Sequence, residues 1–105
     1  MVERQPSSPV ETASLSLSRA EQWTLHQVLL DCLRGEVTAF DGARRVDLRR
    51  AFETTDGGGD TYTHTQLEAM QAALARAHHT RRWEVERPLL EGLLHRVSVP
   101  LEAET

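Results

Sequence analysis

Two short segments of the chain carry the same signature of an extended stretch that leads directly into a helix. In each, a hydroxyl-bearing residue is followed three positions later by a side chain that can bond back to it: Ser18 with Glu21, and Thr63 with Gln66. This spacing forms a capping box, in which the hydroxyl accepts the later residue's amide and the later side chain accepts the cap's own amide. The two boxes therefore predict helices that begin at residues 19 and 64.

The first predicted helix, residues 19–34, has a wide apolar sector. One face follows helical spacing and contains Trp23, His26, Leu29, Leu30 and Leu33. Further apolar residues widen that face, namely Leu25, Val28 and Cys32. Such a wide apolar sector is expected at the centre of a bundle, and Gly35 is a suitable left-handed stop.

The next two predicted helices flank a glycine-rich segment. Residues 43–54 can form a short helix, with Asp41 as its cap and with the apolar side chains Val46, Leu48, Ala51 and Phe52. Three consecutive glycines, residues 57–59, predict a mobile loop after it. The helix over 64–79 follows, with Tyr62 and Leu67 placed as a hydrophobic staple. Its apolar face contains Leu67, Met70, Leu74 and Ala77.

The last predicted helix lies within residues 80–97. Its apolar stripe contains Trp83, Leu89, Leu90, Leu93, Leu94 and Val97. Proline is tolerated in the first turn of a helix but kinks its interior. Pro88 therefore leaves two alternatives: the helix begins near Arg87, or a short turn over 81–86 meets it at a bend. Pro100 is expected to end it.

These elements predict a mainly α fold, a bundle of three to four helices. The extended stretches at residues 14–17 and 60–63 could add a minimal two-stranded ribbon. The two similar junctions could reflect an internal duplication, although chance similarity explains them equally well. For a chain of 105 residues, we expect one helical domain at 14–99. A disordered tail at 1–13 would precede it, and an acidic tail at 100–105 would follow it.

Composition limits the chemical functions and the cellular location that we expect for the protein. All 12 basic residues are arginine, so a Schiff-base or phosphate-loop lysine cannot occur. The net charge of −4 argues against general binding to nucleic acid. No apolar run approaches the ~20 residues of a membrane span, so no membrane partner is expected. The single cysteine cannot form an intramolecular disulfide, and a cytoplasmic location is the default expectation.

Candidate metal ligands lack the required spacing. The loop at 56–60 fails as a calcium site in either register, because glycine or threonine falls at ligand positions. His26 and Cys32 are six residues apart, and His78 and His79 are adjacent, whereas a helical site needs ligands at i, i+3 or i+4. We expect no metal and no cofactor.

Candidate nucleophiles also lack supporting residues. Cys32 lies within an apolar helix face, where a thiol is usually inert. The chain contains no nucleophile elbow, glycine-rich phosphate motif or spaced carboxylate pair in an apolar setting. The chain is therefore not expected to be an enzyme, and no catalytic residue is assigned.

Clustered arginines form one candidate binding surface. They are Arg44, Arg45, Arg49 and Arg50 in the second helix, with Arg81 and Arg82 before Trp83. Guanidinium groups bind phosphate through forked hydrogen bonds, so a small DNA-associated regulator is one hypothesis. The simpler interpretation is a solvated face, in which Asp47 pairs with the arginines three positions away on either side.

Surplus apolar side chains form the other candidate surface. A domain of this size is not expected to cover all of Trp23, Trp83, Leu90 and Leu94. A second copy of the chain would bury them, whereas in the alternative they are internal to a monomer. The leading hypothesis is a non-enzymatic helical protein-interaction module that forms a homodimer. Another protein is the second choice of partner, and nucleic acid is the third.

Two segments resemble known proteins. The run from Leu17 to Asp31, LSRAEQWTLHQVLLD, is similar to the opening of small uncharacterised haloarchaeal proteins. The run from Tyr62 to Glu68, YTHTQLE, is similar to the start of their second helix. The resemblance implies a small cytoplasmic helical protein, and it implies no activity and no site residues.

Overall fold

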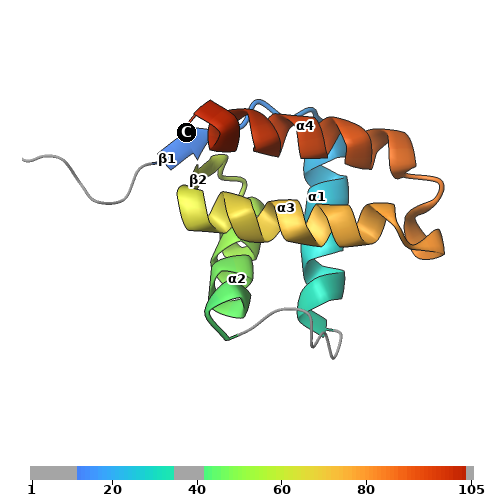
Figure 1. The fold of residues 1–105 in the computed structure, drawn as a ribbon, viewed down its shortest axis with the longest axis horizontal. Helices are drawn as coiled ribbons and strands as arrows, with labels where there is room; N and C mark the ends of the chain where they lie inside the picture. The colour runs from blue at the N-terminus through green and yellow to red at the C-terminus, as the bar shows by residue number, and fades with distance from the viewer. Residues whose placement is uncertain (1–11, 35–41, 104–105) are drawn as a thin grey trace, which may run out of the picture.

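The computed structural model describes residues 12–34 and 42–103 and shows a bundle of helices with a short ribbon (Figure 1). In chain order the elements are β1 (Thr12–Ser14), α1 (Arg19–Arg34), α2 (Gly42–Asp56), β2 (Thr61–Thr63), α3 (His64–His78), the 3-10 helix η1 (Arg81–Trp83) and α4 (Arg87–Ala103). The predicted mainly α fold is therefore confirmed. The tail expected at 1–13 falls largely outside the described residues, as do Gly35 and Asp41.

Both capping boxes form as predicted. The Glu21 amide donates to Ser18 Oγ at 3.1 Å, and the Ser18 amide donates to Glu21 Oε1 at 2.8 Å. At the second junction the Gln66 amide donates to Thr63 Oγ1 at 3.1 Å, and the Thr63 amide donates to Gln66 Oε1 at 3.0 Å. Each box satisfies two backbone amides at a helix start.

The predicted ribbon is also present, with its first strand two residues earlier than expected. β1 pairs antiparallel with β2, so that Ala13 lies opposite Tyr62. The Leu15 amide adds a bond to the Asp60 carbonyl at 2.9 Å. Leu15 and Leu17 suggested the strand in the sequence, but they lie beyond it, where the chain turns toward α1. Leu15 is buried there and Leu17 is half-buried.

The four described α-helices form two layers. In Figure 1, α1 and α2 stand side by side and antiparallel, and α3 and α4 cross in front of them. α1 and α3 each contact all three other helices, which confirms the prediction that residues 19–34 are central. The largest fully buried side chains are Tyr62, Leu25, Leu29, Leu48, Leu67, Met70, Leu74, Leu90, Leu93, Val28 and Val97.

The buried face of α1 differs from the stripe that its spacing suggested. Leu25, Val28, Leu29 and Cys32 are buried, whereas Trp23 is 64% exposed. Leu30 and Leu33 are only half-buried. Helical spacing identified two overlapping apolar faces, and contacts with α3 and α4 decide which of them becomes core.

The last helix begins at Arg87 after η1, so both features proposed around Pro88 occur together. The expectation that Pro100 ends this helix is wrong, because α4 continues to Ala103. A proline removes one helical hydrogen bond. The half-buried Leu101 packs against the core from the final turn, and its burial favours continuing the helix. The helix thus enters the region expected to be an acidic tail.

Across residues 12–34 and 42–103, no helix combines the length and the apolar character that crossing a membrane requires.

Candidate functional site

The four residues proposed to bind a partner do not share one surface. Trp23 is 64% exposed on α1. Trp83 and Leu94 are half-buried and pack against the core. Leu90 is 0% exposed, so its assignment as a partner-binding residue is corrected: it belongs to the core of α4. In the leucine doublet Leu89–Leu90, the second residue points inward, and sequence spacing could not decide between them.

Trp23 is exposed, and its ring contacts a neighbouring side chain of α1. Its ring stacks on the His26 imidazole, with centroids 5.9 Å apart and an interplanar angle of 12°. His26 in turn contacts the ring of Phe52 on α2, with centroids 4.8 Å apart. Three aromatic rings therefore form a continuous row across α1 and α2.

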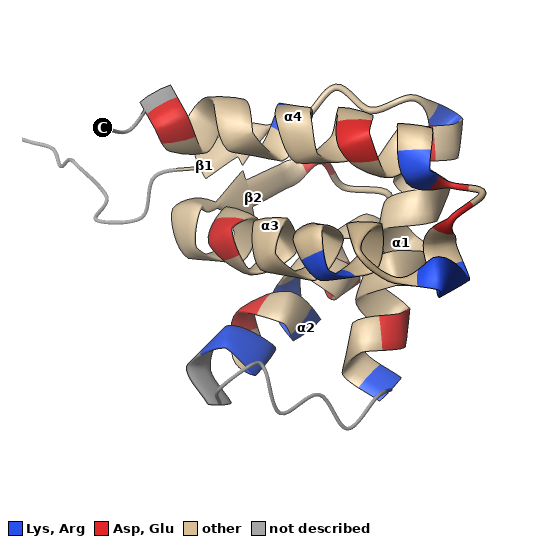
Figure 2. Cartoon of the chain, turned by 45° about the vertical axis from the view of Figure 1, so that its right-hand side comes forward, with Lys and Arg blue, Asp and Glu red and all other residues tan. Residues whose placement is uncertain are grey.

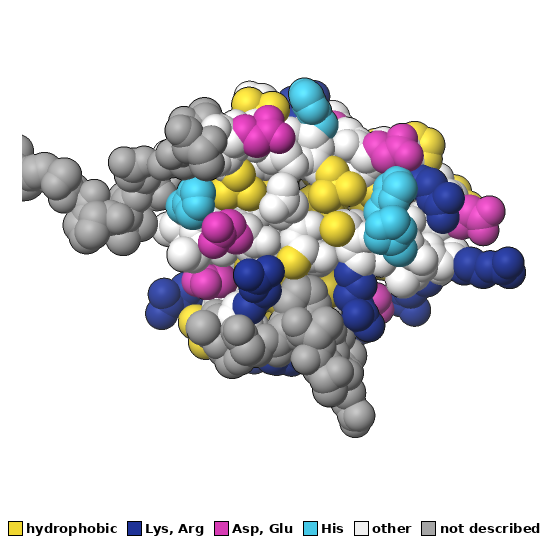
Figure 3. All heavy atoms as spheres, in the orientation of Figure 1, with side chains coloured by type: hydrophobic (Ala, Val, Ile, Leu, Met, Phe, Trp, Pro, Cys, Tyr) yellow, Lys and Arg dark blue, Asp and Glu magenta, His cyan; other side chains and the backbone are white. Residues whose placement is uncertain are grey.

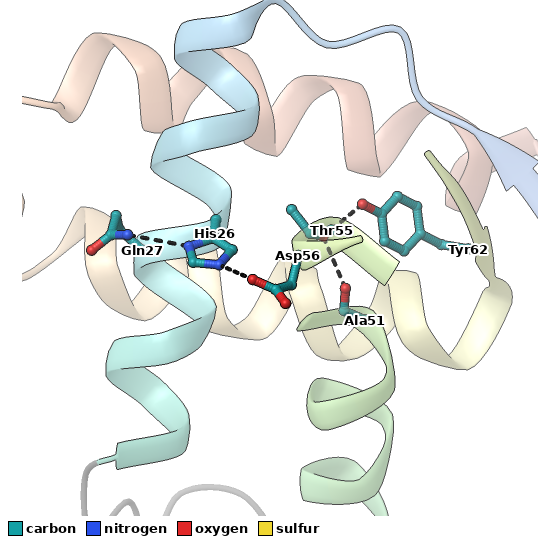
Figure 4. A network of polar contacts seen from close by, with 6 residues as sticks. All are labelled: His26, Gln27, Ala51, Thr55, Asp56 and Tyr62. Atoms are coloured by element: carbon teal, nitrogen blue, oxygen red, sulfur yellow. Dashed lines mark hydrogen bonds and ion pairs between the residues drawn. The ribbon is translucent and has the colours of Figure 1, made fainter. Parts of the chain in front are cut away.

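His26 is fixed by hydrogen bonds on both ring nitrogens (Figure 4). Nε2 lies 2.9 Å from Asp56 Oδ1, and Gln27 Nε2 lies 3.1 Å from Nδ1. An Nδ1 that accepts from Gln27 leaves the ring proton on Nε2, which then donates to the carboxylate. The predicted position of His26 at the edge of the core is confirmed by its side chain's 20% exposure. Asp56, 30 residues away, carried no local signal as its partner.

A shallow pocket of about 360 Å³ lies beside this aromatic row. Its lining is Arg19, Gln22, Trp23, His26, Thr55, Asp56 and Gly58. One arginine and one aspartate leave it without a dominant charge, and no group of three or more metal-ligating side chains occurs within the described ranges. The pocket offers an aromatic wall rather than a reactive group.

Some arginines of the two predicted clusters contact other parts of the chain. Arg45 Nη2 donates to the Leu33 carbonyl at 3.1 Å, in the last turn of α1. Arg82 pairs with Asp31 at 3.2 Å, and its guanidinium lies 5.7 Å from the Trp83 ring centre. Arg44 lines a pocket with Glu68 and Gln71 of α3, away from the outer side of α2.

Figure 2 shows arginine along the first half of α2, far from the turn between α3 and α4 that carries Arg81 and Arg82. The same separation is visible in Figure 1. The backbone segments of the two clusters are therefore separated, although Arg45 and Arg82 both reach the last turns of α1, at Leu33 and Asp31.

The outer side of α2 carries three exposed charged side chains. Arg49, Arg50 and Glu53 are exposed, and none of them forms an ion pair within residues 12–34 and 42–103. The predicted pairing of Asp47 with arginine does not occur for Arg50; Thr65 Oγ1 of α3 donates to Asp47 instead, at 3.4 Å. A second open pocket of about 430 Å³ lies here, lined by Leu33, Arg45, Val46, Arg49, Arg50 and Glu53.

These observations define one surface, which we call the α1–α2 face. It comprises Trp23 of α1 and Val46, Arg49, Arg50 and Glu53 of α2, with the two pockets between the helices. Val46 is 49% exposed, so apolar surface is present at both ends of the face. In Figure 4 α1 and α2 are in front, with α3 and α4 behind them.

The opposite side of the molecule is formed by α3 and α4. Figure 3 shows hydrophobic side chains scattered among histidines and acids there. A shallow pocket of about 440 Å³ includes Ala72, Ala75 and Leu94. His78 of α3 pairs with Glu91 of α4 at 3.0 Å, which joins the two helices at one point of this side.

A partly exposed ion pair that the sequence did not reveal anchors the start of α1. Arg96 Nε donates to Glu21 Oε2 at 3.1 Å, and Arg96 Nη1 donates to the Ser16 carbonyl at 2.6 Å. The pKa of the Glu21 carboxyl is lowered from 4.5, mainly because the Ser18 amide donates to it. Burial opposes this lowering, and Arg96 adds to it. The capping box predicted Glu21's local role but not its distant partner.

Two further buried groups have structural roles. Tyr62 Oη and Thr55 Oγ1 lie 2.7 Å apart, and Thr55 also donates to the Ala51 carbonyl (Figure 4). Burial raises the pKa of the Tyr62 phenol and, with help from Asp31, that of the Cys32 thiol. A raised thiol pKa keeps Cys32 protonated at neutral pH, which fits its expected role as inert packing.

A protein-family model matches most of the chain. The model of DUF7853, a family of unknown function, matches residues 15–98. No curated protein and no solved structure matches the chain. Since residues 15–98 span from the end of the ribbon's first strand into α4, and make up far more than half of the chain, this protein belongs to the DUF7853 family.

Proposed function

We propose that this protein is a non-enzymatic interaction module that forms a homodimer through the α1–α2 face. The observation that carries this proposal is Trp23, which is 64% exposed and whose ring stacks on His26. Large exposed aromatic side chains are enriched among the residues that dominate binding energy in protein interfaces.

The contacts around Trp23 support binding rather than catalysis. Asp56 and Gln27 occupy both nitrogens of His26, so neither is directed at a substrate as a general base. The same bonds fix the ring on which Trp23 rests. A side chain that is ordered before binding loses less conformational entropy when a partner arrives.

The DNA-associated alternative has weaker support. Arg45 and Arg82 are engaged within the chain, and the backbone segments that carry the two arginine clusters are separated in the fold. Duplex binding by phosphate contacts favours a continuous basic surface. A cytoplasmic location remains part of the proposal and rests on the single cysteine.

Sedimentation velocity over about 1–200 µM tests the proposal, because a small two-helix interface is expected to give micromolar affinity. We expect a reversible dimer that Trp23→Ala weakens by about tenfold or more. Val85→Ala is the matched control, since Val85 is 87% exposed in the turn before α4 and should leave the dimer unchanged. A monomer throughout this range, at both low and high salt, would overturn the proposal.

A further inference from the structure

The charges of α2 run against the preference of its own helix dipole. Its first turn contains Arg44 and Arg45 but no acid, and its last turn contains Glu53 and Asp56 but no base. A helix dipole favours acids at the N-terminus and bases at the C-terminus. The helix dipole of α2 therefore does not account for the order of charges within residues 42–56.

Contacts within the chain explain only part of this order. Arg45 donates to the carbonyl end of α1, and Asp56 accepts from His26. Arg49, Arg50 and Glu53 have no ion-pair partner in the described part of the chain. All three are exposed on the α1–α2 face. A basic segment thus precedes an acidic one along a single unpartnered surface.

When two copies of α2 lie antiparallel, the basic segment of each copy faces the acidic segment of the other. We propose that a second copy of the chain docks on the α1–α2 face with its α2 antiparallel to the first, so that Glu53 of each copy lies opposite Arg49 and Arg50 of the other. The proposal rests on the self-association proposed above and specifies its geometry.

Two-fold symmetry allows the antiparallel arrangement of the two α2 helices, and like-charge repulsion disfavours the parallel one. A two-fold axis that crosses the helices reverses their direction and forms each contact twice, once from each copy. An axis parallel to the helices would instead place Arg49 and Arg50 against themselves, and like charges in contact are repulsive. The crossing axis also brings the Trp23 end of one face onto the Leu33 and Val46 end of the other.

The same face fits a second copy better than it fits nucleic acid. Glu53 lies in the pocket with Arg49 and Arg50 and would repel a phosphate backbone. Val46, half exposed in the same pocket, gives it an apolar lining that phosphate does not use. Binding of a DNA duplex by Arg49 and Arg50 is therefore an outcome that counts against the proposal.

Charge reversal provides the test. One variant is Glu53→Arg, which makes the outer side of α2 wholly basic. The other is Arg49→Glu with Arg50→Glu, which makes it wholly acidic. The exposed pair Arg81→Glu and Glu84→Arg, beside α4, supplies matched controls. Circular dichroism melts check that each variant folds, as expected for exposed side chains without ion pairs.

We expect each α2 variant alone to raise the dimer dissociation constant by at least about tenfold. An equimolar mixture of the two should restore dimers as a heterodimer, because every charge contact is then favourable. The control variants should dimerise like the wild type. Weakening of the wild-type dimer by salt would support the same contacts.

The possible failures are distinguishable. A wild-type protein that is monomeric at all concentrations overturns the proposed function itself. If the wild type dimerises while both α2 variants dimerise equally well, the function survives and this docking geometry is wrong. Two weakened variants that do not rescue one another when mixed also overturn the antiparallel arrangement, as does duplex DNA binding that the Arg49 and Arg50 changes abolish.

Discussion

The two strand-to-helix junctions share one local geometry and differ in what surrounds it. At the first, the capping side chain is a buried carboxylate, Glu21, tied to Arg96 of α4. At the second junction the capping side chain is the neutral Gln66. This junction is anchored instead by Tyr62, the buried residue that precedes the cap residue Thr63. The comparison shows that the same capping motif can be joined to the rest of a fold through a charge or through an apolar side chain.

The largest expected difference lies at the residue before each cap. Tyr62→Ala should lower the free energy of unfolding by about 3–5 kcal/mol, because it empties a core site and leaves Thr55 without the phenol. Leu17→Ala should lower it by only about 1 kcal/mol, because Leu17 is half-buried. Urea denaturation measures both. Equal losses would show that the two junctions are anchored alike.

Substitutions of the two capping side chains are expected to give the next largest difference in stability. Glu21→Ala should destabilise the fold by about 1–2 kcal/mol, since it removes a cap and the partly exposed ion pair with Arg96. Gln66→Ala removes only the bond to the Thr63 amide and should cost about 1 kcal/mol. Thermal melts at neutral pH compare them. A smaller loss for Glu21 than for Gln66 would contradict the assigned role of the ion pair.

Glu21→Gln makes the first junction resemble the second and gives a pH signature. The folded-state pKa of Glu21 is lowered from 4.5, so the carboxylate stabilises the fold fully above about that pH, and this contribution is lost as the pH falls through the folded-state value. The wild type should therefore be more stable than the variant at pH 7, and the gap should close in acid. A gap independent of pH would exclude the carboxylate as its source.

The reverse exchange, Gln66→Glu, should have the smallest effect. An acid in the first turn of α3 interacts favourably with the helix dipole, by about 0.5 kcal/mol at low salt. Within residues 12–34 and 42–103 no arginine contacts Gln66, whereas Arg96 contacts Glu21. Melts at low and high salt should show a small gain that salt removes; a gain as large as the loss in Glu21→Gln would make the two junctions equivalent.

The sequence predicted what depends on neighbours along the chain. Both capping boxes, the start of α1 and the buried face of α3 follow from spacings of three or four residues, which are local. The exposure of Trp23 and the burial of Leu90 depend on which side of a broadly apolar helix meets its neighbours. Helical periodicity leaves that rotation undetermined.

The candidate site was only partly predictable for the same reason. Trp23, Arg49 and Arg50 were singled out in the sequence, and all are exposed on the α1–α2 face. Phe52 and Asp56 contact His26, which stacks on Trp23. They lie 26 and 30 positions from His26 along the chain, so no local sequence pattern connects them to it. The Glu21–Arg96 pair spans 75 positions and was equally invisible.

Because Cys32 is buried, alkylation of its thiol can report when the helix bundle opens. Because the chain contains one thiol, and that thiol is 6% exposed within the core face of α1, alkylation requires α1 to separate from its neighbours. Its raised pKa slows reaction further, so the labelling rate in the native state measures how often the bundle opens. No engineered cysteine is needed to follow that opening in real time.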